Sequence, residues 1–82
     1  MTLKIISPQE VIFEGEVKLV TLPGAMGAFT VLKNHASLIS SLVKGTLSYN
    51  QISAADDAEL EKIEIPGGIV VVDNNVISVC VS

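Results

Sequence analysis

Residues 66–81 read PGGIVVVDNNVISVCV, and this stretch decides the fold class. Two apolar runs, 69–72 and 76–81, flank Asp73-Asn74-Asn75, and Pro66-Gly67-Gly68 precedes the first run. Gly, Pro, Asn and Asp are the residues that tight turns favour. Within 76–81, alternation places the even-numbered and the odd-numbered side chains on opposite faces. The stretch therefore predicts a turn, a strand, a second turn and a second strand.

The rest of the chain repeats this arrangement of short segments between turns. Period-two alternation of apolar and polar residues occurs, for example, in Leu3-Lys4-Ile5 and Ile63-Glu64-Ile65. Many short strands at such spacing are typical of a sandwich or barrel of antiparallel sheets, so we predict an all-β fold. The other turn signals are Ser7-Pro8-Gln9, Glu14-Gly15-Glu16, Pro23-Gly24, Gly27, Lys33-Asn34 and Lys44-Gly45.

Some segments leave alternatives open. Residues 35–43 fit a helix face and a strand equally by spacing, and the all-β context favours a strand. Two runs are apolar on both parities when read along the chain, namely 20–22 with its neighbours and 69–72. This indicates strands that are buried on both sides or that lie against a partner. Residues 51–61 are polar and are predicted to form an exposed loop or a wide hairpin.

Length and composition restrict the function. The 82 residues form one domain, 1–82, with a formal net charge of −4 and five Lys plus Arg against nine Asp plus Glu. Nucleic acid and anionic lipid are therefore poor partners, because a negative chain repels phosphate. The single cysteine, Cys80, excludes an internal disulfide, and no apolar run approaches the roughly 20 residues of a spanning helix.

The side chains that carry chemistry do not form a recognisable catalytic or metal motif. His35 is the only histidine, and no serine lies in a nucleophile-elbow pattern, so a loop or interface role is favoured over catalysis. The acidic residues between Asp56 and Glu61 lack the spacing of a calcium loop and are interpreted as a solvated charge run. Cys80 is interpreted as structural. Met26 is expected either to be exposed as a contact residue or to be tucked in.

Three segments resemble the N-terminal domain of the epsilon subunit of F-type ATP synthases, called delta in mitochondria. The most specific is similar to the family pattern over more than twenty positions and is followed by Leu42-x-x-Gly45. It reads Leu22-Pro23-Gly24-x-x-Gly27-x-Phe29-x-Val31-Leu32-x-x-His35-Ala36-x-Leu38. Leu3-x-Ile5-x-Ser7-Pro8 precedes it and Gly67-Gly68-Ile69-Val70-x-Val72 follows it, in the family's order. Departures are Thr30 and Asn34, where glycine is common, and Ser37, where proline is common.

The resemblance implies a ten-stranded antiparallel β-sandwich of two packed sheets. It also implies a non-catalytic, cofactor-free rotor subunit of the central stalk, which links the gamma subunit to the polar loops of the c-ring and couples ion flow to ATP synthesis. The expected location is peripheral, at the cytoplasmic face of a bacterial inner membrane. Because the sequence ends at Ser82, we expect a short form without the C-terminal helices to which the family's autoinhibition and nucleotide binding are attributed.

The resemblance also suggests a contact site for the c-ring. The corresponding residues are Gly24, Ala25, Met26, Gly27 and Ala28, with His35 expected close by. Ala28 stands where an acidic residue is common, so Met26 and backbone groups are the expected contacts. The alternatives are a lipoyl or biotinyl carrier domain, with Lys44 at an exposed hairpin tip, and a generic β-sandwich interaction module.

Overall fold

The computed structural model describes residues 1–53, 55 and 59–82, and the described chain is built from strands. Each turn predicted around residues 7–9, 33–34, 66–67 and 73–75 separates two strands, because its residues accept the required backbone angles. In these residues there is no helix of the length and apolarity needed to cross a membrane. The eight strands are β1 (Thr2–Ile6), β2 (Val11–Gly24), β3 (Gly27–Leu32), β4 (Leu38–Leu42), β5 (Gly45–Gln51), β6 (Glu61–Ile65), β7 (Gly68–Asp73) and β8 (Val76–Val81).

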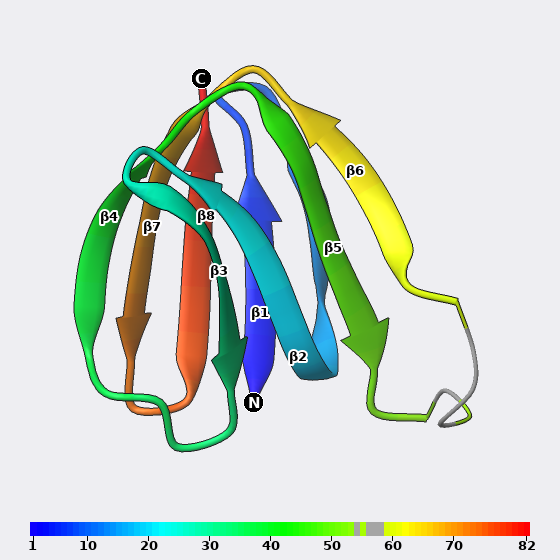
Figure 1. Cartoon of the computed structure of the whole chain (residues 1–82). Helices are drawn as coiled ribbons and strands as arrows, with labels where there is room; N and C mark the ends of the chain where they lie inside the picture. Colours follow the sequence, from blue (N-terminus) through cyan, green and yellow to red (C-terminus); the bar gives the residue numbers. More distant parts are fainter. Residues whose placement is uncertain (54, 56–58) are drawn as a thin grey trace.

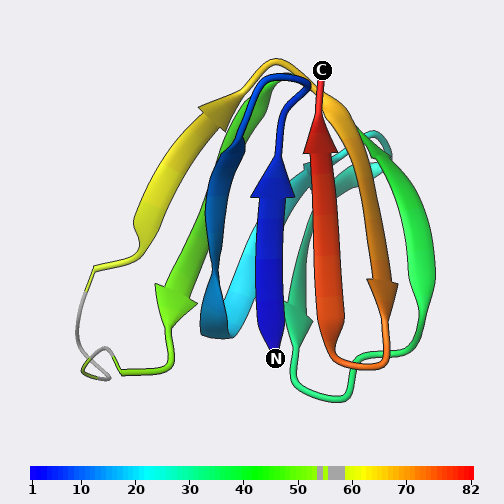
Figure 2. The ribbon, with the colours of Figure 1, turned by 180° about the vertical axis from the view of Figure 1, so that it is seen from behind.

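The strands form two layers, shown from the front in Figure 1 and from behind in Figure 2. The first layer contains β4, β7, β8, β1 and residues 11–16 of β2, and the second contains β3, residues 17–24 of β2, β5 and β6. The prediction of an all-β sandwich is confirmed. The expected strand number of ten is wrong, because eight strands are present in the described chain.

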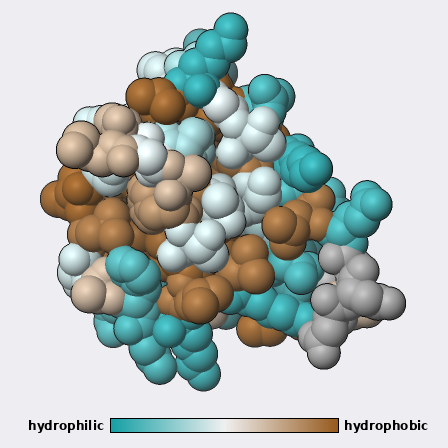
Figure 3. Space-filling view, in the orientation of Figure 1, coloured by the Kyte–Doolittle hydropathy of each residue, from teal (hydrophilic) through white to brown (hydrophobic). Residues whose placement is uncertain are grey.

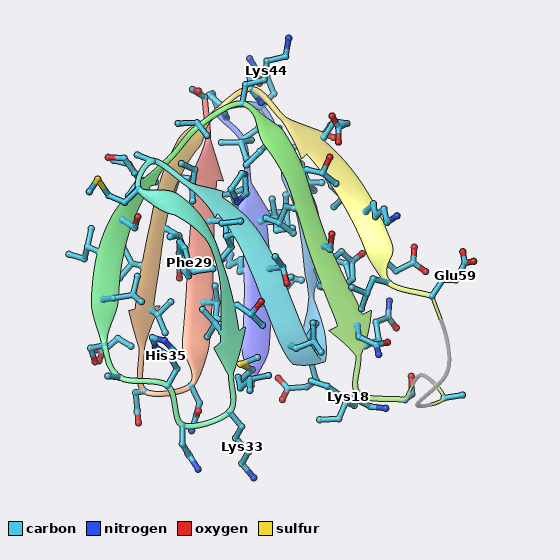
Figure 4. All side chains as sticks on the ribbon, viewed as in Figure 1. Lys18, Phe29, Lys33, His35, Lys44 and Glu59 are labelled. Atoms are coloured by element: carbon cyan, nitrogen blue, oxygen red, sulfur yellow. The ribbon has the colours of Figure 1, made fainter. Side chains whose placement is uncertain are left out.

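The long strand β2 explains part of the difference in strand number. It was expected to be interrupted at Glu14-Gly15-Glu16, but Gly15 pairs with Leu3 inside the strand. β2 bends over the lower end of the molecule near Lys18, where its register with β5 shifts (Figure 4). A bulge allows a strand to change direction without leaving its ladder. One strand therefore belongs to both layers.

The expectation of purely antiparallel pairing is also corrected. β1 and β8 run parallel, with Thr2 opposite Val76 and Ile6 opposite Cys80, whereas the other strand pairs are antiparallel. Parallel strands need a long connection, and here nearly the whole chain lies between the two. A pairing between the first and last strands leaves no local trace in the sequence.

The core lies between the layers and follows the alternation of each strand. Val70 and Val72 of β7 are buried, as are Ile77, Val79 and Val81 of β8. Facing them are the inward residues of the second layer. Fully buried side chains of both layers include Leu3, Ile5, Leu22, Val31 and Leu47.

Two asparagines tie neighbouring turns together at the lower end of the molecule. Asn34 and Asn75 adopt positive φ angles of 65° and 63°, which asparagine tolerates better than most residues. The amide N of Asn34 donates to Oδ1 of Asn75 at 2.7 Å, and Nδ2 of Asn75 donates to Oδ1 of Asn34 at 3.1 Å. This reciprocal pair fixes the β3–β4 connection against the β7–β8 turn.

The polar segment 51–61 connects the antiparallel pair β5 and β6, as a wide hairpin requires. Asp56 and Asp57, which were interpreted as part of a solvated charge run, lie outside the described residues. The predicted strand within 35–43 is confirmed as β4.

Candidate functional site

The tip of the β2–β3 hairpin presents a fully exposed methionine. β2 ends at Gly24 and β3 begins at Gly27, so Ala25 and Met26 form a two-residue connection. Gly27 has a φ of 121°, which favours glycine, and a Cβ on Gly24 would lie 2.8 Å from both the carbonyl O of Gly27 and the ring of Phe29. The side chain of Met26 is 99% exposed, so the tucked-in alternative is wrong, and a contact role for Met26 stays a prediction.

Backbone hydrogen bonds hold this hairpin tip beside the end of β4. The amide N of Ala25 donates to the carbonyl O of Ser41 at 2.9 Å, and the amide N of Val43 donates to the carbonyl O of Pro23 at 2.9 Å. Gly24 also pairs with Leu42. The tip is therefore fixed relative to the first layer as well as the second.

β4 and β7 expose aliphatic side chains on the outer face of the first layer. Because Val70 and Val72 point into the core, alternation turns Ile69 and Val71 outward, where they are 51% and 39% exposed. Val71 lies opposite Ile39, which is 77% exposed. We call Ile39, Ile69 and Val71 the apolar outer face. Of the two alternatives for residues 69–72, contact with a partner fits this exposure.

The surface is uneven in polarity. In Figure 3, near-neutral side chains cover the middle of the second layer, and hydrophilic ones lie along the right and lower edges. Apolar side chains gather at the left of the view, over the hairpin tip and β4. The hairpin tip, with Met26, and β4, with Ile39, thus form one apolar side of the molecule.

An open groove lies at the end of the β4–β7 pair and overlaps the apolar outer face at Ile39 and Val71. Its volume is about 380 Å³. At its rim, Oγ of Ser37 donates a hydrogen bond of 2.6 Å to Oδ1 of Asp73, which joins the start of β4 to the end of β7. The groove is lined by Ser37, Leu38, Ile39, Val71, Val72 and Asp73.

His35 does not lie close to the hairpin tip. Figure 4 places it below β4, in the connection that follows β3. β3 has six residues, and its five rises of roughly 3.3 Å separate the two end residues by about 17 Å. The side chain is exposed, and Nδ1 lies 2.7 Å from the carbonyl O of Ala36. The structure therefore brings together residues 24–28 and leaves His35 at the opposite end of β3.

The remaining candidates stand apart from one another. Within residues 1–53, 55 and 59–82, no three His, Cys, Asp or Glu side chains cluster closely enough to hold a metal ion. Cys80 is exposed on the outward row of β8, opposite Ile69. Lys44 is exposed at the β4–β5 turn, as the carrier hypothesis requires of its lysine (Figure 4).

Taken together, the fold and this surface define a small β-sandwich domain with an exposed apolar side. The chain matches the family described as ATP synthase, Delta/Epsilon chain, beta-sandwich domain over residues 1–82. It therefore belongs to that family, as the sequence resemblance indicated, and the carrier hypothesis is set aside.

Curated relatives agree with this assignment. An ATP synthase epsilon chain of Campylobacter jejuni is 45% identical over 76 residues, which cover 93% of this chain and 56% of the relative. Epsilon chains of Campylobacter lari and Leptospira borgpetersenii are 40% and 32% identical over 79 residues, which cover 96% of this chain and 58% of each relative. The chain thus spans little more than half the length of these relatives.

Solved structures share the fold. A chain in the central stalk and c-ring structure of the Tetrahymena thermophila mitochondrial ATP synthase matches with a TM-score of 0.80 at 18% identity, covering 99% of this chain and 62% of that one. A chain in the Euglena gracilis mitochondrial ATP synthase structure matches with a TM-score of 0.83 at 22% identity, covering 96% and 48%. At such identities the likeness supports the architecture.

Proposed function

We propose that this chain is the β-sandwich domain of a central-stalk subunit in an F-type ATP synthase, where it links the gamma subunit to the c-ring. The observation that carries the proposal is the family match across all 82 residues. In this role the domain couples ion flow to ATP synthesis mechanically and performs no catalysis itself. A close-packed sandwich suits that role because its interior deforms little under load.

The apolar outer face is the surface we assign to the gamma subunit. Ile39, Ile69 and Val71 are exposed although they are aliphatic, and grouped exposed aliphatic residues mark contact sites. From their exposed fractions, covering the three would contribute on the order of 3 kcal/mol, at about 1.5–3 kcal/mol per fully buried side chain. This is a useful share of the affinity of a stable subunit contact.

We assign the hairpin tip, residues 24–28, to the polar loops of the c-ring. Met26 projects fully into solvent, and Ala28 brings no charge, so the contact would use the thioether and backbone groups. His35 lies at the other end of β3, so we do not include it in this contact. The relatives' bacterial origin supports a complex peripheral to the membrane, and we place this domain on its cytoplasmic face.

Size-exclusion chromatography with the gamma subunit of the same organism, followed by hydrogen exchange, tests the proposal. We expect one-to-one co-elution, with added protection in β4 and β7. Ile39→Asp should weaken binding by at least about tenfold, because it places a charge in an apolar contact. Leu32→Asp is the matched control: it changes an exposed aliphatic residue of β3, in the second layer, and should leave binding unchanged. Separate elution at micromolar concentration would refute the stalk role.

A further inference from the structure

The groove shares Ile39 and Val71 with the apolar outer face and combines an aliphatic wall with one carboxylate. Leu38, Ile39, Val71 and Val72 form the wall, and among the residues that the structure describes Asp73 is the only charged one lining the groove. A docking side chain that enters the groove therefore meets aliphatic carbon over most of its length. At the Asp73 end it meets an acceptor.

The Asp73 carboxylate is held in place but is not neutralised. Ser37 donates to Oδ1, which fixes the orientation of the group. Among the described residues, Asp73 has no ion pair with a cation and no second hydrogen-bond donor to its side chain. A fixed carboxylate without a cationic partner is complementary to a lysine or arginine on a docking surface.

We propose that this groove binds an aliphatic side chain of the gamma subunit and that Asp73 pairs with a neighbouring lysine or arginine of that subunit. The proposal rests on the proposed function and adds the chemistry that selects the partner. Apolar contact alone would accept many surfaces. The carboxylate at one end of the groove favours a partner with a cation at one position and fixes the register of docking.

Asp73→Asn tests the charge, since the amide keeps the shape of the side chain and can still accept from Ser37. We expect the dissociation constant for the gamma subunit to rise about three- to tenfold at low salt. The difference in dissociation constant between this variant and the unchanged chain should shrink at high salt, because screening weakens an ion pair. Glu59→Gln is the matched control, as it removes one exposed negative charge from the β5–β6 connection and should leave affinity and salt dependence unchanged.

Val71→Phe tests the apolar wall, because a ring at this outward position would cover the groove and leave the core residues in place. We expect at least about a tenfold loss of affinity, with thermal unfolding of the free chain unchanged. If Asp73→Asn binds like the unchanged chain at low salt while Ile39→Asp abolishes binding, the docking face stands and the role of Asp73 is refuted. If the unchanged chain itself does not bind the gamma subunit, the proposed function fails and this proposal fails with it.

Discussion

Gly68 at the start of β7 is the position where one methyl group should cost the fold most. Its φ is +150°, and a Cβ there would lie 2.2 Å from the carbonyl O of Cys80 on β8. A strained backbone costs about 1–3 kcal/mol, and the overlap adds to it, so Gly68→Ala should destabilise the fold by at least about 3 kcal/mol. At roughly 0.05–0.15 kcal/mol per residue, the free energy of unfolding of the whole domain is about 4–12 kcal/mol.

Gly27→Ala is the control that separates strain from overlap. Gly27 has a φ of +121°, but a Cβ there would have no heavy atom within 4 Å. This substitution should cost about 1 kcal/mol, which corresponds to a fall in Tm of about 4–8 °C. Thermal and urea unfolding measure both variants, and Gly68→Ala should lower Tm by on the order of 15 °C. If the two variants unfold alike, the close approach of β7 to β8 does not restrict this position and the reasoning is wrong.

Three further predictions concern single side chains. Phe13→Ala should cost about 2 kcal/mol in urea unfolding, since Phe13 is partly buried and its ring lies 4.5 Å from that of Tyr49; a cost below about 0.5 kcal/mol would contradict this packing. Asn75→Gly removes the side-chain hydrogen bonds with Asn34 and should lower the free energy of unfolding by about 1 kcal/mol. Asn75→Ala should lower it by about 1 kcal/mol more, because position 75 has a positive φ that alanine adopts poorly. Equal losses for the two variants would show that φ does not matter. Burial, and to a smaller extent the negative charge of Glu61, raise the pKa of Tyr49 above 10.0. The near-ultraviolet absorbance of Tyr49 should therefore titrate above that pH, and Glu61→Gln should lower the midpoint of this titration. The unfolded chain then loses the proton first, so the stability contributed by neutral Tyr49 is present below about pH 10 and is lost as pH rises through the higher folded value.

Local features of the chain could be predicted from the sequence. The hairpin tip at residues 24–27 and the turn at 73–75 depend on backbone angles that glycine and asparagine accept, so the residues themselves indicate the turns. The family resemblance was carried by the same positions. The inward and outward rows of β8 also followed directly from alternation.

Features that depend on distant segments could not be predicted. The change of direction of β2 near Lys18 coincides with a register shift against β5, which no local turn signal marks. The nearby Gly15 looked like a turn residue, but it pairs with Leu3 in the ladder, and the ring of Phe13, 3.0 Å from where a Cβ would stand, explains why glycine occupies the position. The pair Ser37 and Asp73 is 36 residues apart and meets only through the register of β4 and β7. The sequence offered one indication of an exposed apolar surface near this pair. The run 69–72 is apolar on both parities, although only one of its faces reaches the core.

The strand order closes on itself, which has a mechanical consequence. From β2 the ladder runs through β1, β8, β7 and β4 and returns to β2 where Gly24 pairs with Leu42. The hairpin tip and the apolar outer face thus belong to one closed ring of paired strands. Near Met26, hydrogen bonds from Ala25 and Val43 join the two. A force applied at the tip is shared between the two directions around this ring of strands, through β1 and through β4. Many inter-strand hydrogen bonds therefore bear the force at the same time. We therefore expect the tip and the face to move together, so that a displacement of one is transmitted directly to the other.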